Sequence, residues 1–345
     1  MRKLVLITQV VDPDDPNLGA TCAKIAALAR TVDEVAVICD RGRDGVLPEN
    51  CRVRRFGSSS RARRAARFAA AIAAEMRDRP VGVLAHMIPL YAVVAAPFVR
   101  PRRVPLMLWY THWKAHNVLR LATFLCTDVL SVDARSFPLR TSKLRAIGHG
   151  IDLGEFPCRP PAPAAAELRI VSLGRYSRAK RLDELVEGVR IARERGVAAR
   201  IDLFGTTGGP ALEEYKRELE ELVGRDGYRA FASVGGPVPR TDVPSVYERA
   251  DVVASAFNSP DKIVFEAAAS CRPVLAADVS FDALLAGIEP PLAFERGRPE
   301  TLADRIEALA RLGADERGAI GKELRERVRT QHSVETWAER IVALT

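Results

Sequence analysis

Residues 168–182 read LRIVSLGRYSRAKRL, an apolar run followed by Gly174 and a loop that carries several cations. A second stretch of the same form, residues 251–266, reads DVVASAFNSPDKIVFE. Each stretch predicts a buried strand, a polar loop and the start of a helix. In an open α/β sheet, ligands bind at the carboxyl ends of the strands. Arg175 and Lys180 on one loop and a helix N-terminus on the other suit a pyrophosphate, so we predict two halves of one anion-binding site.

Strands and helices are expected to alternate along all 345 residues, which predicts parallel sheets with crossover helices. The expected strands are 3–9, 34–39, 81–86, 104–109, 128–132, 143–147, 168–173, 200–204, 229–234, 251–255 and 273–277. The expected helices include 20–30, 59–77, 182–194, 211–223 and 262–270, and a helical tail from residue 300 that breaks at Gly313. The proline-rich segment 157–163 cannot join a sheet and indicates a linker. The fold class predicted is α/β, with two doubly wound, Rossmann-like domains.

Charge is distributed unevenly between the two halves. Residues 1–160 carry 25 Lys and Arg against 14 Asp and Glu, whereas the remainder carries 27 against 30. Within the basic half, residues 59–76 form an amphipathic helix pattern with arginines crowding its first turns. One interpretation is docking on anionic lipid or on a charged acceptor; the other is a solvated helix face. Nucleic acid is not the expected partner, because only 6% of residues are aromatic and no recognition motif is present.

The cysteines and the apolar segments bear on the compartment. The six cysteines form no CxxC pair, so we expect neither a disulfide framework nor a zinc site, and a reduced cytosol. The apolar opening Met1–Ile7 ends too soon for a signal peptide and predicts a first strand. Residues 81–99 form a charge-free window, but the prolines within it favour a strand, a loop and a helix over a membrane span.

Four positions are candidates for chemistry besides Arg175 and Lys180. Glu266 lies one helical turn after Lys262, so its carboxylate can accept the hydroxyls of a ribose while Lys262 and free backbone N–H groups meet phosphate. The alternative is a plain ion pair on an exposed helix. His112 follows a strand and can hydrogen-bond a sugar, although a lone histidine is often structural. Gly19 begins the first helix and allows either close approach to a phosphate or a simple turn.

With these residues in view, the chain resembles the retaining glycosyltransferases of family 4, which have the GT-B fold. Ile170 to Arg175 with Lys180 is similar to the family's G-R-x4-K segment, whose Arg and Lys hold the donor diphosphate. The stretch around Glu266 resembles that of the second Glu in its E-x7-E motif, which binds the ribose. Leu108–His112 is similar to the loop whose His approaches the donor sugar. Residues 147–152 resemble the interdomain N-G-V-D segment, and the Trp337 helix resembles the one that crosses back onto the first domain.

The resemblance implies a division of the chain. Residues 1–155 would form the acceptor-binding domain, 156–166 the linker and 167–330 the nucleotide-sugar donor-binding domain, with 331–345 as a helix that packs back on the first domain. Backbone N–H groups near Ile263 and Val264 would meet phosphate. The family's first E-x7-E glutamate falls at Asn258, which keeps an acceptor atom but loses the charge that contacts the donor sugar. Donor preference and full activity are the properties that this departure affects.

The function implied is transfer of a sugar from a UDP- or GDP-type nucleotide-sugar to an acceptor glycan, a lipid-linked acceptor or a small molecule, with retention of configuration. Such transfer would serve cell-envelope glycan, glycolipid or secondary-metabolite assembly, in the cytoplasm or on the inner face of the membrane. No cofactor and no divalent metal are expected, because Arg175 and Lys180 can neutralise the diphosphate. Two alternatives stay open: a sugar-nucleotide epimerase on the same fold, and a catalytically weak donor-binding partner protein.

Overall fold

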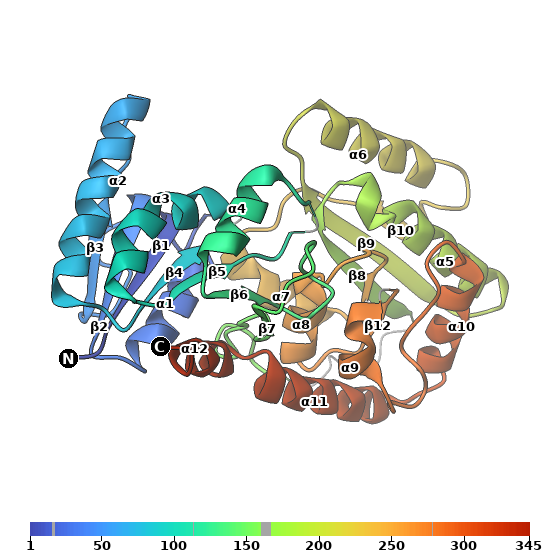
Figure 1. Ribbon diagram of the computed structural model, residues 1–345. Helices are drawn as coiled ribbons and strands as arrows, with labels where there is room; N and C mark the ends of the chain where they lie inside the picture. Colours follow the sequence, from blue (N-terminus) through green and yellow to red (C-terminus); the bar gives the residue numbers. More distant parts are fainter. Residues whose placement is uncertain (16–17, 113, 160–166, 278) are drawn as a thin grey trace. The chain divides into compact units, whose positions relative to one another are not determined.

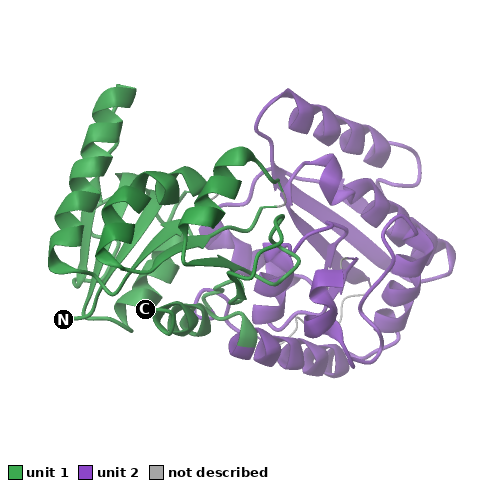
Figure 2. Ribbon diagram, in the orientation of Figure 1, with its two compact units in different colours: residues 1–152, 331–345 green, residues 153–330 purple. Residues whose placement is uncertain are grey.

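The computed structural model describes residues 1–15, 18–112, 114–159, 167–277 and 279–345. These residues divide into two compact units (Figures 1 and 2): unit 1 comprises Met1–Asp152 with Gln331–Thr345, and unit 2 comprises Leu153–Thr330. Each unit is a parallel sheet with crossover helices, which confirms the predicted α/β class. Pro16, Asn17, Trp113 and residues 160–166 of the expected linker lie outside the described residues.

Unit 1 is built on one parallel sheet, whose described strands run in the order β3-β2-β1-β4-β5-β6-β7. The strands are β1 (Lys3–Val11), β2 (Glu34–Gly42), β3 (Cys51–Arg55), β4 (Gly82–His86), β5 (Leu106–Trp109), β6 (Asp128–Ser131) and β7 (Leu144–Ala146). The helices are α1 (Thr21–Ala29), α2 (Arg61–Glu75), α3 (Pro89–Val99), α4 (Asn117–Leu125) and α12 (Val334–Val342), with short 3-10 turns η1 (Met76–Asp78) and η2 (Arg100–Arg102).

Unit 2 has a smaller parallel sheet, whose described strands run in the order β10-β9-β8-β11-β12. The strands are β8 (Leu168–Arg175), β9 (Ala199–Thr206), β10 (Ala232–Val234), β11 (Val252–Ser255) and β12 (Val274–Ala276). The helices are α5 (Leu182–Glu194), α6 (Pro210–Val223), α7 (Val243–Arg249), α8 (Lys262–Ala269), α9 (Asp282–Leu285), α10 (Pro299–Ala310) and α11 (Ala314–Gln331). Three 3-10 turns are η3 (Arg178–Lys180), η4 (Arg240–Asp242) and η5 (Val279–Phe281).

The strands form where apolar residues run without interruption. The side chains of Leu4 to Ile7 in β1 are fully buried, as expected for a parallel strand that is covered on both faces. The strand that the sequence did not predict is β3, which reads CRVRR. Its arginines hide the period-two pattern of Cys51 and Val53, and β3 lies at the edge of the sheet, where charged side chains reach water.

Helix α2 covers the sheet of unit 1 with its apolar face. Phe68 and Ile72 are buried in the core of unit 1, and the ring of Phe68 meets that of Phe56 edge-on at 5.2 Å between centroids. The arginines at the start of α2 are exposed. Because the apolar face is already occupied by the core, it cannot insert into a membrane, and the amphipathic pattern of residues 59–76 is that of a helix with one solvated face.

The last helix belongs to unit 1. Trp337 of α12 is fully buried, and its ring meets that of Trp109 at the end of β5 edge-on, 5.6 Å between centroids. The Lys24 ammonium of α1 lies 5.1 Å from the Trp337 ring centre and 4.8 Å from that of Trp109. The expected return of the C-terminal helix to the first domain is therefore confirmed.

The expectation that the cysteines form no disulfide is wrong for one pair. Cys158 and Cys271 are joined, with their Cα atoms 5.1 Å apart, while Cys22, Cys39, Cys51 and Cys126 are free thiols. The two half-cystines are separated by 113 residues in the chain. Because such a pairing depends on which segments the fold brings together, no local spacing in the sequence could have revealed it.

The charge-free window of residues 81–99 is divided between β4 and α3, as expected. No helix in the described part of the chain is long and apolar enough to cross a membrane.

Candidate functional site

The two loops singled out in the sequence lie side by side in unit 2. They follow β8 and β11, which are neighbouring parallel strands at the centre of the sheet. The chain runs outward from β8 through β9 to β10, and then returns to β11 on the other side of β8. The carboxyl ends of β8 and β11 therefore form a topological switch point, which is where open α/β sheets bind ligands.

The first loop places two cations at this switch point. Gly174 has φ +141°, a backbone conformation that favours glycine, and the Lys180 ammonium lies only 2.7 Å from where a Cβ would be, so Lys180 approaches the backbone closely at the strand end. Arg175 follows at once; its side chain is exposed and pairs with none of the described residues. Lys180 ends the short turn η3 and is 13% exposed. Of the two cations, Arg175 is the one with its charge uncompensated.

Lys180 is held by a residue of the second loop that the sequence analysis did not select. Its ammonium lies 2.5 Å from Oδ2 of Asp261, and this carboxylate oxygen also accepts a hydrogen bond of 2.8 Å from the Ser255 hydroxyl at the end of β11. Asp261 is buried, at 6% exposure. Its position just before α8 was visible in the sequence, but its partner was not, because the two residues are 81 positions apart. The ion pair brings the two predicted half-sites into contact.

Glu266 is the buried carboxylate of the site, at 3% exposure on α8. As the spacing predicted, it pairs with Lys262 one turn earlier, at 2.9 Å. Two further partners come from elsewhere in unit 2: the guanidinium of Arg240 pairs with Oε1, and the Tyr247 hydroxyl donates to Oε2 at 3.3 Å. Burial alone would raise the pKa of Glu266, but the charges of Lys262 and Arg240 outweigh it and hold that pKa below its usual range.

Arg240 was missed in the sequence because it stands alone in a loop. It also pairs with Glu155 at 2.6 Å, and its guanidinium stacks 4.9 Å from the Phe156 ring centre. The rule that ligands bind at the carboxyl ends of the strands could have found Arg240. Its loop follows β10, and so leaves the sheet at the same end as the loops after β8 and β11. Arg240 thus ties the ribose candidate Glu266 to the segment that opens unit 2.

The remaining donor-side candidates lie around the start of α8. Asn258 is exposed in the loop before it, whereas Ile263 and Val264 in its first turn have buried side chains. The N–H of Val264 donates to the Asp261 carbonyl at 3.1 Å. Backbone N–H groups at a helix start favour an anion, and Asn258 offers an amide on the same loop.

In unit 1, His112 lines a pocket of about 450 Å³. The pocket lies beyond the carboxyl ends of β4 and β5, and its wall is mostly apolar. Its other lining residues are Met87, Ile88, Pro89, Leu90, Tyr110, Lys114, His116 and Val118. Nδ1 of His112 accepts a hydrogen bond from the Lys114 N–H at 3.0 Å, which fixes the ring beside the pocket. His116 is engaged in structure instead, because its Nδ1 accepts from the Leu119 N–H and caps α4.

The structure provides a local reason for glycine at position 19. A Cβ there would lie 2.3 Å from the Pro13 carbonyl oxygen and 2.8 Å from that of Asp15. The Gly19 N–H also donates to the Asp15 carbonyl at 2.9 Å. The turn interpretation therefore accounts for this glycine without a ligand.

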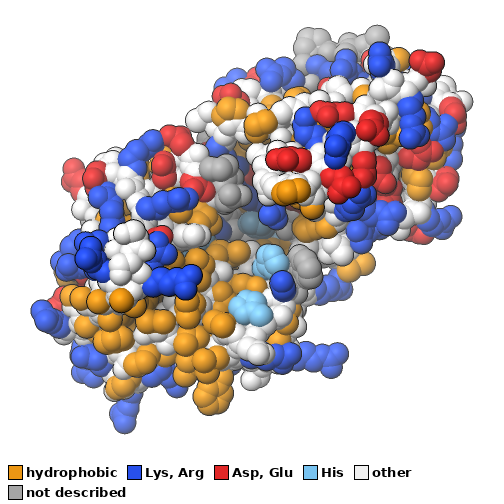
Figure 3. All heavy atoms as spheres, turned by 90° about the horizontal axis from the view of Figure 1, so that it is seen from above, with side chains coloured by type: hydrophobic (Ala, Val, Ile, Leu, Met, Phe, Trp, Pro, Cys, Tyr) orange, Lys and Arg blue, Asp and Glu red, His pale blue; other side chains and the backbone are white. Residues whose placement is uncertain are grey.

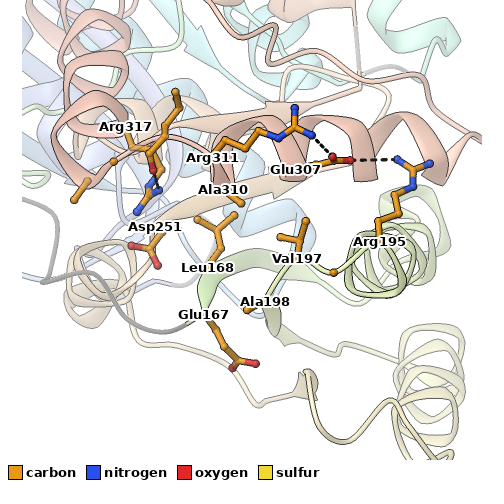
Figure 4. A pocket seen from close by; sticks show the side chains of 14 residues that line it. Glu167, Leu168, Arg195, Val197, Ala198, Asp251, Glu307, Ala310, Arg311 and Arg317 are labelled. Carbon is orange, nitrogen blue, oxygen red and sulfur yellow. Dashed lines mark hydrogen bonds and ion pairs between the residues drawn. The ribbon is translucent and has the colours of Figure 1, made fainter.

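Unit 2 has a pocket of about 490 Å³ (Figure 4), which lies at the other end of its strands from the candidate site. Leu168, the first residue of β8, lines it, so it lies at the amino end of the strand whose carboxyl end carries Arg175. Its carboxylates have arginine partners: Glu307 pairs with Arg311 and Arg195 (Figure 4). A pocket at the amino ends of the strands is not the expected ligand position in this kind of sheet, and we assign no substrate to it.

Among the described residues, no group of three or more His, Cys, Asp or Glu side chains is placed to hold a metal ion. The cationic side chains of the site are those of Arg175, Lys180, Lys262 and Arg240.

Solved structures of known proteins share the fold of this chain. Sucrose-phosphate synthase from Thermosynechococcus elongatus matches with a TM-score of 0.74 at 18% identity, over 100% of this chain and 98% of that one. The Anabaena protein Alr3699/HepE, solved in complex with UDP and glucose, also gives 0.74 at 18% identity, over 99% of each chain. The two units of this chain therefore have the GT-B fold, in which the last helix belongs to the first unit.

The likeness to a family lies in the sequence of unit 2. Residues 167–311 match the glycosyl transferases group 1. The putative colanic acid biosynthesis glycosyltransferase WcaL of Escherichia coli (strain K12) is 28% identical over 196 residues, which are 52% of this chain and 45% of WcaL. The chain thus spans less than half the length of that relative. Residues 167–311 thus carry the likeness to the group 1 glycosyltransferases, and the fold of the chain is the GT-B fold.

Proposed function

We propose that this protein transfers a sugar from a nucleotide-sugar to an acceptor with retention of anomeric configuration. The observation that carries the proposal is the contact between Lys180 and Asp261, because it joins the two candidate half-sites at the switch point of the sheet in unit 2. The family match covers both loops. The Alr3699/HepE complex with UDP and glucose supports a UDP-sugar as the donor here.

Each candidate residue then has a role that its surroundings permit. Arg175 and Lys180 would stabilise the negative charge that develops on the departing nucleoside diphosphate. Asp261 would act as a positioning residue, because its buried carboxylate aims the Lys180 ammonium. The N–H of Ile263, with Lys262, would meet phosphate at the start of α8, whereas the Val264 N–H is already engaged by the Asp261 carbonyl.

Glu266 would accept the ribose hydroxyls. A carboxylate offers about four acceptor positions. Lys262, Arg240 and Tyr247 already use three contacts, two of them on Oε1, so capacity remains on Oε2. Asn258 would contact hydroxyls of the donor sugar. His112 would lie near the reacting sugar, beside a pocket of unit 1 whose wall is mostly apolar.

No nucleophile of the enzyme is needed in this scheme. The acceptor hydroxyl attacks the anomeric carbon from the face that the diphosphate leaves, and the departing phosphate takes the proton. The products are the glycosylated acceptor and the nucleoside diphosphate, with the charge of the latter held by Arg175 and Lys180. The name of WcaL supports an acceptor in cell-envelope glycan assembly.

A thermal-shift panel of UDP- and GDP-sugars tests the proposal. A donor present at about 100 times its Kd stabilises the native protein by about 2.7 kcal/mol, so one class of nucleotide-sugar should raise the melting temperature. The stabilising donor is then incubated with lipid-linked and soluble acceptors, and the product linkage is read by NMR. Absence of any shift contradicts the proposal. Conversion of the donor into an epimer without acceptor would establish the epimerase, and binding without turnover of any acceptor would establish the binding protein.

A further inference from the structure

Helices α3 and α4 of unit 1 carry an exposed apolar face. Among the described residues, seven large hydrophobic side chains are exposed, and five of them lie on these two helices. We call these five the α3–α4 face: Leu90, Val94, Val118, Leu121 and Phe124. Phe124 is 76% exposed and Leu90 51%. An exposed apolar cluster of this kind marks a contact surface more often than a solvated one.

The spacing shows that this is one face and not scattered residues. Leu90 and Val94 are four apart on α3, and Val118, Leu121 and Phe124 are each three apart on α4, so on each helix they lie on one side. The inner sides of both helices supply core residues of unit 1, including Ala92, Ala96 and Leu119. The outer sides of α3 and α4 therefore take no part in the core of unit 1 and remain exposed.

The segment of the chain that carries the face has charges of one sign. From residue 79 to residue 127 the sequence contains no Asp or Glu. It contains six cations: Arg79, Arg100, Arg102, Arg103, Lys114 and Arg120. Lys143 lies beside the last turn of α4, with its ammonium 5.9 Å from the Phe124 ring centre. Figure 3 shows one region of the surface where hydrophobic side chains gather with Lys and Arg at its margins.

We propose that the α3–α4 face is the surface by which this protein docks on an anionic lipid bilayer. Exposed apolar side chains on a segment whose charges are all cationic match the boundary between acyl chains and anionic head groups. The long Arg and Lys side chains can reach the head groups while the apolar residues enter the layer. A second copy of this chain fits less well, because pairing two such faces would bring like charges together.

The proposal replaces the docking role considered for α2, whose apolar face is buried in the core. It also deepens the proposed function, and on this point rests on it. Leu90 and Val118 belong both to the α3–α4 face and to the wall of the His112 pocket. A lipid-linked acceptor could therefore present its sugar end to that pocket while its hydrocarbon part stays in the bilayer.

Vesicle sedimentation of the full chain tests the docking. Vesicles are made from equal parts of phosphatidylglycerol and phosphatidylcholine, or from phosphatidylcholine alone. We expect binding to the anionic vesicles, and a loss of about tenfold or more in affinity for the double variant Leu121→Ser, Phe124→Ser, because two apolar side chains no longer enter the layer. Phe124→Leu should retain most of the binding. All these side chains are exposed, so circular dichroism and melting temperature should match the wild type.

Two controls separate the α3–α4 face from its alternatives. The variant Arg61→Gln, Arg63→Gln removes cations from α2, which carries none of the exposed large hydrophobic side chains, and should lose less binding than the Leu121, Phe124 double variant. Arg175→Ala alters the proposed donor site and should sediment as the wild type does, so failure of the proposed function leaves this test intact.

Three outcomes would overturn the docking proposal. They are equal sedimentation with both kinds of vesicle, unchanged binding of the Leu121, Phe124 double variant, and a larger loss for the α2 variant than for that double variant. Gel filtration adds a fourth. If the wild type is a dimer that the double variant abolishes, and neither binds vesicles, the face is an interface between copies of this chain.

Discussion

At the scale of single residues, the two cations of the first loop differ in how they are held. Lys180 is partly buried and paired with Asp261, whereas Arg175 is exposed and pairs with no described residue. A preset ammonium costs little reorganisation when charge develops on a leaving group. An uncompensated guanidinium can instead grip two phosphate oxygens when the donor arrives. We therefore expect both residues to matter, by different means.

Replacing Arg175 or Lys180 by Ala should lower kcat by about 10²–10³ each, because each change removes one electrostatic contact to the departing diphosphate. Steady-state kinetics with the donor identified in the thermal-shift panel measure this effect. Arg178→Ala is the matched control, since Arg178 lies on the same loop but pairs with Glu218 at the surface. Losses below about tenfold in both test variants would contradict the assigned roles.

His86 makes the stability of the protein depend on pH. Burial, with a smaller contribution from Lys24, lowers the pKa of His86 to about 3. In the unfolded chain the ordinary value is about 6.5, so between these two values the unfolded state binds a proton that the folded state does not. The stabilisation is complete above about pH 6.5 and is lost as the pH falls toward about 3.

Between pH 7 and pH 5, His86 should therefore cost about 2 kcal/mol of the free energy of unfolding. Urea unfolding at both pH values, for wild type and His86→Asn, measures this difference. The variant is expected to lose about 2 kcal/mol less than the wild type over the same interval, whatever its stability at pH 7. Parallel losses in the two proteins would show that His86 does not carry the effect.

At the scale of elements, an amphipathic pattern predicts that a helix forms, but it does not predict what the apolar face of that helix packs against. The pattern of residues 59–76 correctly predicted α2, but the same pattern describes a helix on a core and a helix on a membrane. Only the packing of Phe68 and Ile72 in the core distinguishes them. Residues 81–99, by contrast, show little amphipathic contrast, yet α3 within them contributes exposed apolar residues.

The disulfide between Cys158 and Cys271 ties the segment that opens unit 2 to the residues just after α8. Because it closes a long loop, we expect it to stabilise unit 2 by about 2–4 kcal/mol, chiefly by restricting the unfolded chain. Urea unfolding with and without a reducing agent measures this contribution. The reducing agent should leave Cys158→Ser unaffected, and an equal loss of stability in that variant would assign the effect to something else.

At the scale of the whole molecule, the chain order and the structural units do not coincide. The last helix lies in unit 1, although all of unit 2 precedes it in the sequence. Backbone hydrogen bonds also hold the start of α12 against Ile151. The Ile151 N–H donates to the His332 carbonyl at 2.8 Å, and the Val334 N–H donates to the Ile151 carbonyl at 2.9 Å. Unit 1 is therefore complete only after all of unit 2 has been made.

Trp337→Ala tests this dependence. Removing a fully buried tryptophan leaves a cavity and should cost about 3–5 kcal/mol of the free energy of unfolding of unit 1. Glu335→Ala is the control on the same helix, because its ion pair with Arg30 is exposed and contributes about 1 kcal/mol at most. Hydrogen exchange, followed by mass spectrometry, can localise the effect. Faster exchange confined to unit 2 would contradict the assignment of α12 to unit 1.

Local sequence accounts for much of the fold and for part of the site. Uninterrupted apolar runs and their polar loops predicted most strands, α5 and α8, because burial on both sides of a parallel sheet demands such runs. The same reasoning selected Arg175, Lys180, Lys262 and Glu266 as candidates. The spacing of Lys262 and Glu266 predicted their contact, since a helix brings residues four apart together.

Tertiary structure decided what depends on partners far away in the chain. Asp261 meets Lys180 across 81 residues, Arg240 meets Glu266 from another loop, and Cys158 meets Cys271. It also decided which apolar helix face is buried, on α2, and which is left exposed, on α3 and α4. The physical reason is the same in each case. The spacing of apolar and charged residues along the chain shows which side chains need a partner. Which partner each one meets is determined only when the crossover helices bring distant strands together in the two sheets.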